Sequence, residues 1–150
     1  MPWPSGWRAR ILRAFGARIG IGVVIKPRVN IHFPWRLEMG DYSCLGEGVE
    51  IYNFAPVTIG SHCCISQRAM LCAANHDYRD PTLKYRNAPI EIGDGVWVCA
   101  CAFVGPGVQL GDEAVISVGS IVTKSMPANM VCSGNPCVAV KARWRSNAEN

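Results

Sequence analysis

The stretch IGDGVW VCACAF VGPGVQ LGDEAV ISVGSI (Ile92–Ile121) decides the fold, and it divides into five segments of six residues. Each segment opens with an aliphatic residue, usually followed by Gly or a small polar residue, and a small or β-branched residue falls four places after the first. A six-residue period fits neither an amphipathic helix nor a strand with alternating side chains. It predicts one short side of a β-solenoid, in which the aliphatic residue points inward and the small residue turns the corner.

The same period extends over most of the chain and predicts a triangular prism of about five coils. Three sides of six residues close one coil, so coil starts should recur about every 18 residues. The starts are Ile19, Met39, Ile59, Ile92 and Leu110, at intervals of 20, 20, 33 and 18 residues. Two coils therefore carry two extra residues, and one carries a 15-residue insertion near residues 77–91. Stacked coils bury a continuous aliphatic column, so we expect an all-β fold, a parallel β-helix.

Composition indicates one globular domain. Of its 150 residues, 49% are hydrophobic and 17% charged, and 15 Lys+Arg against 11 Asp+Glu give a net charge of +4. The longest apolar run, Val96–Val104, has nine residues, whereas a membrane-spanning helix needs about 20. The N-terminus lacks the apolar segment of a secretory signal. The eight Cys include no C-x-x-C pair, which argues against zinc knuckles and fits small buried residues in a reducing compartment, so we expect a cytoplasmic protein.

The N-terminal segment, residues 1–18, precedes the repeat and is predicted to cap it. Residues 7–15 predict a short helix, ended by Gly16, with three apolar residues on one face: Trp7, Ile11 and Phe15. We expect this helix to cover the first coil. Seven of the 15 basic residues precede the first acid, Glu38, so this end is also suited to weak contact with an anionic surface at the inner face of the membrane.

The repeat domain is expected to span residues 19–137, with the loop at 77–91 inserted in it. Residues 138–150 form a C-terminal tail outside the hexad pattern. Within this tail, Val138–Trp144 predicts a basic terminal strand or helix.

Three histidines are candidates for chemistry, and their places in the repeat distinguish them. His62 lies inside a hexad at a corner position, and His32 follows an inward Ile, so they are interpreted as a surface or stacking residue and a turn residue. His76 stands where the repeat breaks, immediately before the insertion. Functional residues concentrate on loops held by a rigid scaffold, so His76 is the candidate functional histidine.

Several motifs carry a resemblance to a known family: Gly119–Lys124, Ser133–Pro136, Ile31–Leu37, Gly40–Ser43, Ile65–Gln67 and Asn75–Pro81. Over roughly residues 8–141 the chain resembles the hexapeptide-repeat acyltransferases, and within them the colanic-acid-type exopolysaccharide O-acetyltransferases. The resemblance implies a left-handed coil, acetyl-CoA as acyl donor, a carbohydrate acceptor, no metal, and a homotrimer with active sites between neighbouring subunits. Right-handed crossovers are the general rule, so the left hand is implied by the family alone.

The resemblance also implies roles for individual residues. His76 matches the catalytic histidine, which as general base would take the proton of the sugar hydroxyl. The backbone N–H of Ala100 would donate to the tetrahedral oxyanion. Cofactor contacts fall on six positions: Trp97, Ala100, Val118, Thr123, Lys124 and Lys141. Weaker assignments for orienting His76 or holding the sugar are Asn75, Asp77 and Tyr85.

The chain departs from the family pattern at a few of these positions. Ala100 stands where relatives often carry Ser, and Val138 stands where relatives carry Arg, a phosphate contact for which Arg143 is a candidate substitute. Cys44 and Gly46 replace the Tyr and Asn of acetyltransferases that act on small galactosides. These replacements favour an exopolysaccharide acceptor over a simple galactoside.

Other readings stay open at this point. Cys99 and Cys101 lie near the implied acetyl site, although direct transfer is favoured over a cysteine nucleophile because neither has a neighbouring His or Lys in sequence. The histidine spacing disfavours the zinc site of carbonic anhydrases with this fold. A non-catalytic solenoid scaffold and an acetyltransferase for a non-sugar small molecule are the alternatives. The modest, mostly N-terminal charge disfavours nucleic-acid binding.

Overall fold

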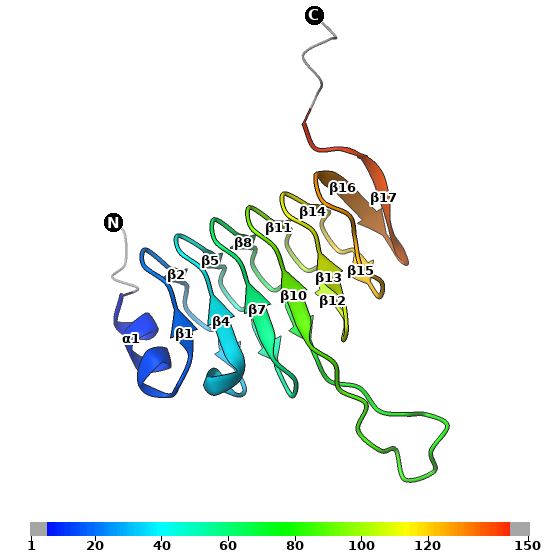
Figure 1. Ribbon diagram of the computed structural model, residues 1–150, viewed down its shortest axis with the longest axis horizontal. Helices are drawn as coiled ribbons and strands as arrows, with labels where there is room; N and C mark the ends of the chain where they lie inside the picture. The colour runs from blue at the N-terminus through cyan, green and yellow to red at the C-terminus, as the bar shows by residue number, and fades with distance from the viewer. Residues whose placement is uncertain (1–5, 145–150) are drawn as a thin grey trace, which may run out of the picture.

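A computed structural model describes residues 6–144, in which short parallel strands form the three sides of a triangular prism (Figure 1). Sheet A contains β1 (Arg18–Ile19), β4 (Leu37–Met39), β7 (Val57–Ile59), β10 (Ile90–Ile92) and β13 (Gln109–Leu110). Sheet B contains β2 (Val24–Ile25), β5 (Cys44–Leu45), β8 (Cys64–Ile65), β11 (Trp97–Val98), β14 (Val115–Ile116), β16 (Met130–Gly134) and β17 (Cys137–Ala142). Sheet C contains β3 (Asn30–Ile31), β6 (Glu50–Tyr52), β9 (Met70–Cys72), β12 (Phe103–Val104) and β15 (Ile121–Val122).

The register of sheet A confirms the predicted coil starts. Ile19 pairs with Met39, Met39 with Ile59, Ile59 with Ile92, and Ile92 with Leu110. An incomplete sixth turn follows, because Met126 bridges to Leu110 and β16 pairs with β14. The fold is the left-handed parallel β-helix that the family resemblance implied.

The core is the aliphatic column that the hexads predicted. In sheet B, Leu45, Ile65, Val98 and Ile116 lie in successive paired strands, and all four are fully buried. Burying one such side chain contributes about 1.5–3 kcal/mol. Each coil shields its neighbour, so the prism is stable as a stack and its two ends need covers.

The first corner of each coil, between sheets A and B, depends on glycine because successive coils approach closely there. A Cβ on Gly60 would lie 2.6 Å from the carbonyl oxygen of Gly93 in the next coil, and one on Gly40 would lie 2.5 Å from the backbone nitrogen of Ser61. His62 occupies the third position of this corner with a φ of 57° and stacks on Tyr42 at 5.4 Å, as the stacking interpretation predicted.

All extra residues of the repeat fall at one corner, between sheet C and sheet A. The first coil holds the short 3-10 helix η1 (Pro34–Arg36) there, and the second coil holds residues 53–56. The third coil holds residues 73–89, which extend away from the prism as the long loop in Figure 1. The register on both sides of each insertion is kept, so this CA corner changes length without disturbing the core.

The predicted helix is present as α1 (Gly6–Ala14), and it packs against β1 and β2 of the first coil. The face that contacts the coil differs from the one suggested by the apolar spacing. Ala9 is buried and Leu12 is partly buried against the core, whereas Trp7 and Ile11 are about half exposed. Small Ala9 allows close approach of the helix, and Arg13 fixes it by donating to the carbonyl oxygens of Ile19 and Gly20 at 2.9 and 2.7 Å.

The C-terminal residues form a strand, which resolves the two options left by the sequence. β17 pairs antiparallel with β16, and Val138 lies opposite Ser133. Within residues 6–144, no helix has the length and apolar character needed to span a bilayer.

Candidate active site

His76 lies on the stalk of the long loop, where two segments of the loop pair. It forms an antiparallel bridge with Tyr85, and backbone N–H groups of Asp77 and Arg86 donate to the carbonyls of Lys84 and Asn75, each at 2.8 Å. These bonds give an irregular insertion the rigidity of a hairpin. The loop therefore holds His76 at a defined place beside the CA corner.

A backbone carbonyl sets the tautomer of His76. The ring Nδ1 lies 2.5 Å from the carbonyl oxygen of Leu83. A carbonyl can only accept a hydrogen bond, so Nδ1 carries the hydrogen in the neutral ring. Nε2 is then the unprotonated nitrogen, and the residue is exposed. This arrangement is the one required of a histidine that accepts a proton.

Two of the residues predicted to hold the acceptor or His76 also support the loop itself. The side-chain oxygen of Asn75 accepts from the backbone N–H of His76 at 2.8 Å, and that of Asp77 accepts from the N–H of Arg79 at 3.0 Å. Farther out, Asp80 accepts two hydrogen bonds from Thr82, which lower the pKa of its carboxyl. Roles for Asn75 and Asp77 toward a substrate stay predictions.

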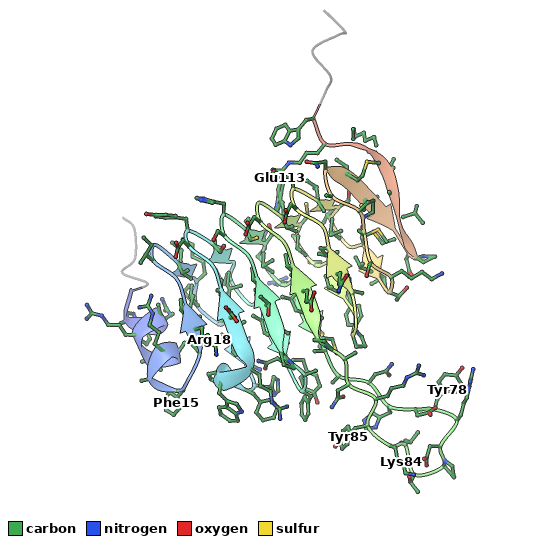
Figure 2. The ribbon with its side chains drawn as sticks, in the orientation of Figure 1. Phe15, Arg18, Tyr78, Lys84, Tyr85 and Glu113 are labelled. Carbon is green, nitrogen blue, oxygen red and sulfur yellow. The ribbon has the colours of Figure 1, made fainter. Side chains whose placement is uncertain are left out.

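Tyr85 connects His76 to a cluster of aromatic rings on the CA corner, which the sequence analysis missed. Its ring centroid lies 4.8 Å from that of His76 and 6.3 Å from that of Phe54, on which it stacks at 15°. Phe54 in turn contacts Phe33 and Tyr52 at 4.9 and 4.7 Å. Figure 2 shows Tyr85 on the part of the loop that lies closer to the prism, with Tyr78 farther out. The signal in the sequence was the pair of two-residue insertions, which supply Phe33 and Phe54.

His32 belongs to this aromatic cluster and lies in the bend that follows β3, in agreement with its interpretation as a turn residue. Its Nε2 lies 2.9 Å from a carboxyl oxygen of Glu50, and its ring lies 4.5 Å from that of Tyr52 in an edge-on arrangement. The cluster thus combines ring faces with a carboxylate and an imidazole at its rim. Such a surface offers both apolar contact and hydrogen bonds to a polar molecule.

Three predicted cofactor residues lie at or just before a different corner, the BC corner between sheets B and C. Trp97 in β11 donates from its indole nitrogen to Ser66 at 2.9 Å, and Ala100 follows at the corner itself. Val118 occupies the same corner one coil later and is 70% exposed. The N–H of Gly119 donates to the carbonyl of Ala100 at 3.0 Å, and this hydrogen bond joins the corner segments of the two successive coils. The Ala100 N–H has no acceptor within residues 6–144, so it is free to donate to a ligand.

The remaining predicted cofactor residues lie toward the C-terminal end of the prism. Thr123 and Lys124 are exposed at the CA corner after β15, and Lys141 is exposed on β17. Arg143 does not replace the missing phosphate contact at Val138. Its guanidinium donates to the carbonyl of Gly95 at 2.7 Å and pairs with Glu113 at 3.2 Å, so it is committed to the fold.

The structure does not bring His76 together with Ala100 and Val118 in one chain. They occupy the two ends of sheet C, and a side of about five residues spans roughly 15 Å because each strand residue advances about 3.3 Å. A base must come within hydrogen-bond distance of the hydroxyl that it activates. The two corners can therefore contribute to one site only if they come from different chains.

The Cys99 thiol, near the BC corner, is poorly suited to nucleophilic attack. Burial raises the pKa of the Cys99 thiol, and the nearby Cys64 raises it further. A raised pKa reduces the thiolate fraction, which is the reactive form. In the described part of the chain, no group of three His, Cys, Asp or Glu side chains is arranged to hold a metal ion.

Comparison with known proteins finds acetyltransferases among the most similar sequences. The chain is 46% identical over 137 residues to the "Putative colanic acid biosynthesis acetyltransferase WcaF" of Escherichia coli (strain K12), covering 91% of this chain and 75% of the relative. It is 29% identical over 137 residues to the galactoside O-acetyltransferase of the same organism, covering 89% and 68%. No protein-family model matches it.

Solved structures repeat the fold. A galactoside acetyltransferase in complex with coenzyme A superposes with a TM-score of 0.86 at 27% identity, over 95% of this chain and 73% of that one. A hexapeptide-repeat-containing acetyltransferase, VCA0836 of Vibrio cholerae O1 biovar eltor, complexed with acetyl coenzyme A, gives a TM-score of 0.86 at 24% identity, over 93% and 78%.

Proposed function

The chain belongs to the family of WcaF-type hexapeptide-repeat acetyltransferases, and from this premise we propose that it acetylates a sugar hydroxyl with acetyl-CoA as donor. The acceptor is a carbohydrate used in an exopolysaccharide or other surface glycan, as the name of the WcaF relative suggests. The observation that carries the proposal is the hydrogen bond between Nδ1 of His76 and the Leu83 carbonyl, which leaves Nε2 as a proton acceptor on an exposed loop.

In the proposed reaction His76 is the general base. A sugar hydroxyl is too weakly acidic to attack a thioester unaided, so Nε2 takes its proton as the oxygen bonds to the acetyl carbon. The carbon–sulfur bond then breaks, and the thiolate of CoA leaves with the proton that the imidazolium returns. The free N–H of Ala100 is available to the oxyanion of the tetrahedral intermediate.

Donor binding is proposed along the coil edges. Val118 and Trp97 would contact the pantetheine arm, and the cations of Lys124 and Lys141 would offset the phosphate charges of the nucleotide. Thr123 adds a hydroxyl donor beside Lys124. The thioester itself is attacked directly in a ternary complex, which agrees with the raised pKa of the Cys99 thiol.

The proposed assembly is a homotrimer in which His76 of one chain faces the BC corner of the next. This arrangement is supported by the separation of roughly 15 Å between the two corners of one chain. On the acceptor side, Tyr85 and Phe54 would stack on the apolar face of a sugar ring, and Asn75 and Asp77 would offer polar contacts at the loop. Eight free thiols suit a reducing compartment, so we place the reaction in the cytoplasm.

A matched pair of histidine variants tests the proposal. His76→Asn keeps a polar side chain but cannot take a proton, so kcat in an acetyl-CoA thiol-release assay with candidate oligosaccharides should fall by about 10²–10⁴-fold. His62→Asn is the control, because His62 is an exposed corner residue with a positive φ that Asn also tolerates. It should keep the wild-type rate.

The outcome of this assay also separates the alternatives. A loss of only a few-fold for His76→Asn would remove the residue from its proposed role. Failure of the wild-type protein to bind acetyl-CoA by calorimetry would favour a scaffold without catalysis. Turnover with a small non-sugar alcohol, and none with any glycan, would contradict the carbohydrate acceptor.

A further inference from the structure

The side of α1 opposite its contact with β1 and β2 is apolar and partly uncovered within residues 6–144, and Trp7 and Ile11 line a hollow there with Ile25, Val29 and Ile31 of the first coil. With about 100° between successive helical residues, the direction of Trp7 and Ile11 lies roughly 150° from that of Ala9 and Leu12, which contact the first coil. Trp7 is 52% exposed, Ile11 47% and Phe15, just after the helix, 64%. We call these three residues the Trp7 face. A capping helix does not need such a face, because Ala9 and Leu12 already cover the coil.

Positive charge surrounds the Trp7 face. Residues 1–37 contain seven basic residues and no acid, whereas the rest of the chain has eight basic against eleven acidic residues. Arg18 and Arg28 form ion pairs with acids of the second coil, Glu38 and Glu47. Arg10 and Lys26 form no ion pair within the described residues. The N-terminal end of the prism is therefore a basic surface on a molecule whose remainder is slightly acidic.

The Trp7 face is held in place by the fold. Arg13 donates to the carbonyls of Ile19 and Gly20, and the N–H of Ala17 donates to the carbonyl of Leu12 at 3.0 Å. Arg8 lies over the indole of Trp7 at 4.6 Å, with one nitrogen 3.4 Å from the carbonyl of Ile25. The helix is thus fixed with Trp7 and Ile11 half exposed beside the first coil. Figure 1 shows α1 at one end of the prism and the His76 loop well away from it.

We propose that this end of the molecule binds the surface of an anionic lipid bilayer, with the Trp7 face entering the headgroup region. An amphipathic helix with aromatic and aliphatic residues between cations is suited to lie in a membrane interface, where both burial and charge contribute. The positive charge of this end favours an anionic lipid surface over a second copy of the chain as its binding partner. A second copy of the same end would bring its own Arg10 and Lys26 against these cations, whereas anionic headgroups neutralise them.

Vesicle sedimentation tests the inference without any enzymatic readout, so it is independent of the proposed function. Vesicles of phosphatidylcholine with about 30 mol% phosphatidylglycerol should bind the protein, and vesicles of phosphatidylcholine alone should not. Binding should weaken strongly in about 0.5 M NaCl, where charges are screened within a few ångströms. Equal binding to both vesicle types, or none to either, would overturn the proposal.

Two variants locate the binding surface. Arg10→Gln with Lys26→Gln should lower the partition coefficient about 25-fold, since each cation near such a surface contributes about a fivefold factor. Trp7→Ser with Ile11→Ser should lower it by about tenfold or more. All four side chains are exposed, so far-UV circular dichroism and melting temperature should stay close to wild type.

A charge-matched control distinguishes a local surface from net charge. Arg68→Gln with Arg79→Gln removes two exposed cations, one from a corner of the prism and one from the long loop, and it should leave binding within about twofold of wild type. An equal loss in this control would refute a specific surface. Unchanged binding of the Trp7→Ser/Ile11→Ser variant would also refute it. So would a lower oligomer mass for that variant in analytical ultracentrifugation, because a second copy would then be the occupant.

Discussion

Mixed trimers of two differently disabled chains test whether the active site is shared between subunits. One chain carries His76→Asn and lacks the base. The other carries Val118→Trp, which places a bulky ring where the donor arm is proposed to lie. Val118 is an exposed corner residue, so the larger side chain meets no core packing. Each homogeneous protein should be nearly inactive.

The expected activity of the mixture follows from the geometry. Sheet C separates the two corners of one chain by roughly 15 Å, whereas proton transfer needs about 3 Å. In a cyclic trimer each site then takes His76 from one chain and Val118 from its neighbour. With random assembly from equal amounts, about one quarter of the interfaces combine two intact halves. A site built within one chain would give no activity in this mixture.

The assay is thiol release after denaturation and refolding of the mixed chains. Wild-type chains mixed with the double variant His76→Asn/Val118→Trp are the control. A shared site predicts about one quarter of wild-type activity there too, whereas a site within one chain predicts about one half. Zero activity in the first mixture together with half activity in the control would refute the shared site.

Three further predictions concern the loop, a corner and the thiols. Tyr85→Ala removes a ring 4.8 Å from that of His76, so the KM for the acceptor should rise by about tenfold with little change in stability; a fall in kcat alone would contradict a binding role. Gly60→Ala places a methyl 2.6 Å from the Gly93 carbonyl oxygen and should lower the free energy of unfolding in urea by about 2–3 kcal/mol. Gly119→Ala has open space around the methyl but a positive φ, and should lower it by about 1–2 kcal/mol. Equal losses for the two variants would argue against the clash. Burial raises the pKa of the Cys63 thiol, so the unfolded chain releases this proton at lower pH than the folded chain does. The free energy of unfolding should therefore fall above about pH 8.5, by up to about 1.4 kcal/mol per pH unit for this thiol, and the fall should be smaller in Cys63→Ala.

The fold was predictable because one physical requirement repeats along the chain. Every sixth residue must be apolar to fill the prism, so residues such as Ile59 and Leu110 fix the register without any knowledge of the insertions. The place of His76 on the inserted loop was predictable for the opposite reason, since it stands where that requirement stops, whereas its catalytic role stays a prediction. The separation of His76 from Ala100 could also have been predicted from the six-residue period. Counting hexads puts His76 after a sheet C segment and Ala100 after a sheet B segment, at different corners.

Other features depend on packing that no periodicity contains. The apolar spacing of Trp7, Ile11 and Phe15 suggested that these residues cover the first coil. Instead, α1 packs closely on that coil through the small side chain of Ala9 and through the hydrogen bonds of Arg13. The aromatic cluster was missed because a two-residue insertion looks like a spacer in a repeat. The sequence also left open whether Arg143 was free for phosphate. Its hydrogen bonds to Gly95 and Glu113 join residues that lie 48 and 30 positions away along the chain.

The CA corner has a consequence for how such an enzyme acquires new acceptors. It is the one edge, within residues 6–144, where coils of this prism differ in length, and the pairing above and below each difference is unaltered. Evolution can therefore lengthen, shorten or exchange segments on that edge while the BC corner, with Ala100 and Val118, is inherited unchanged. Grafting the segment 73–89 from one relative into another should transplant a preference for acceptor more readily than substitutions scattered over the three sheets.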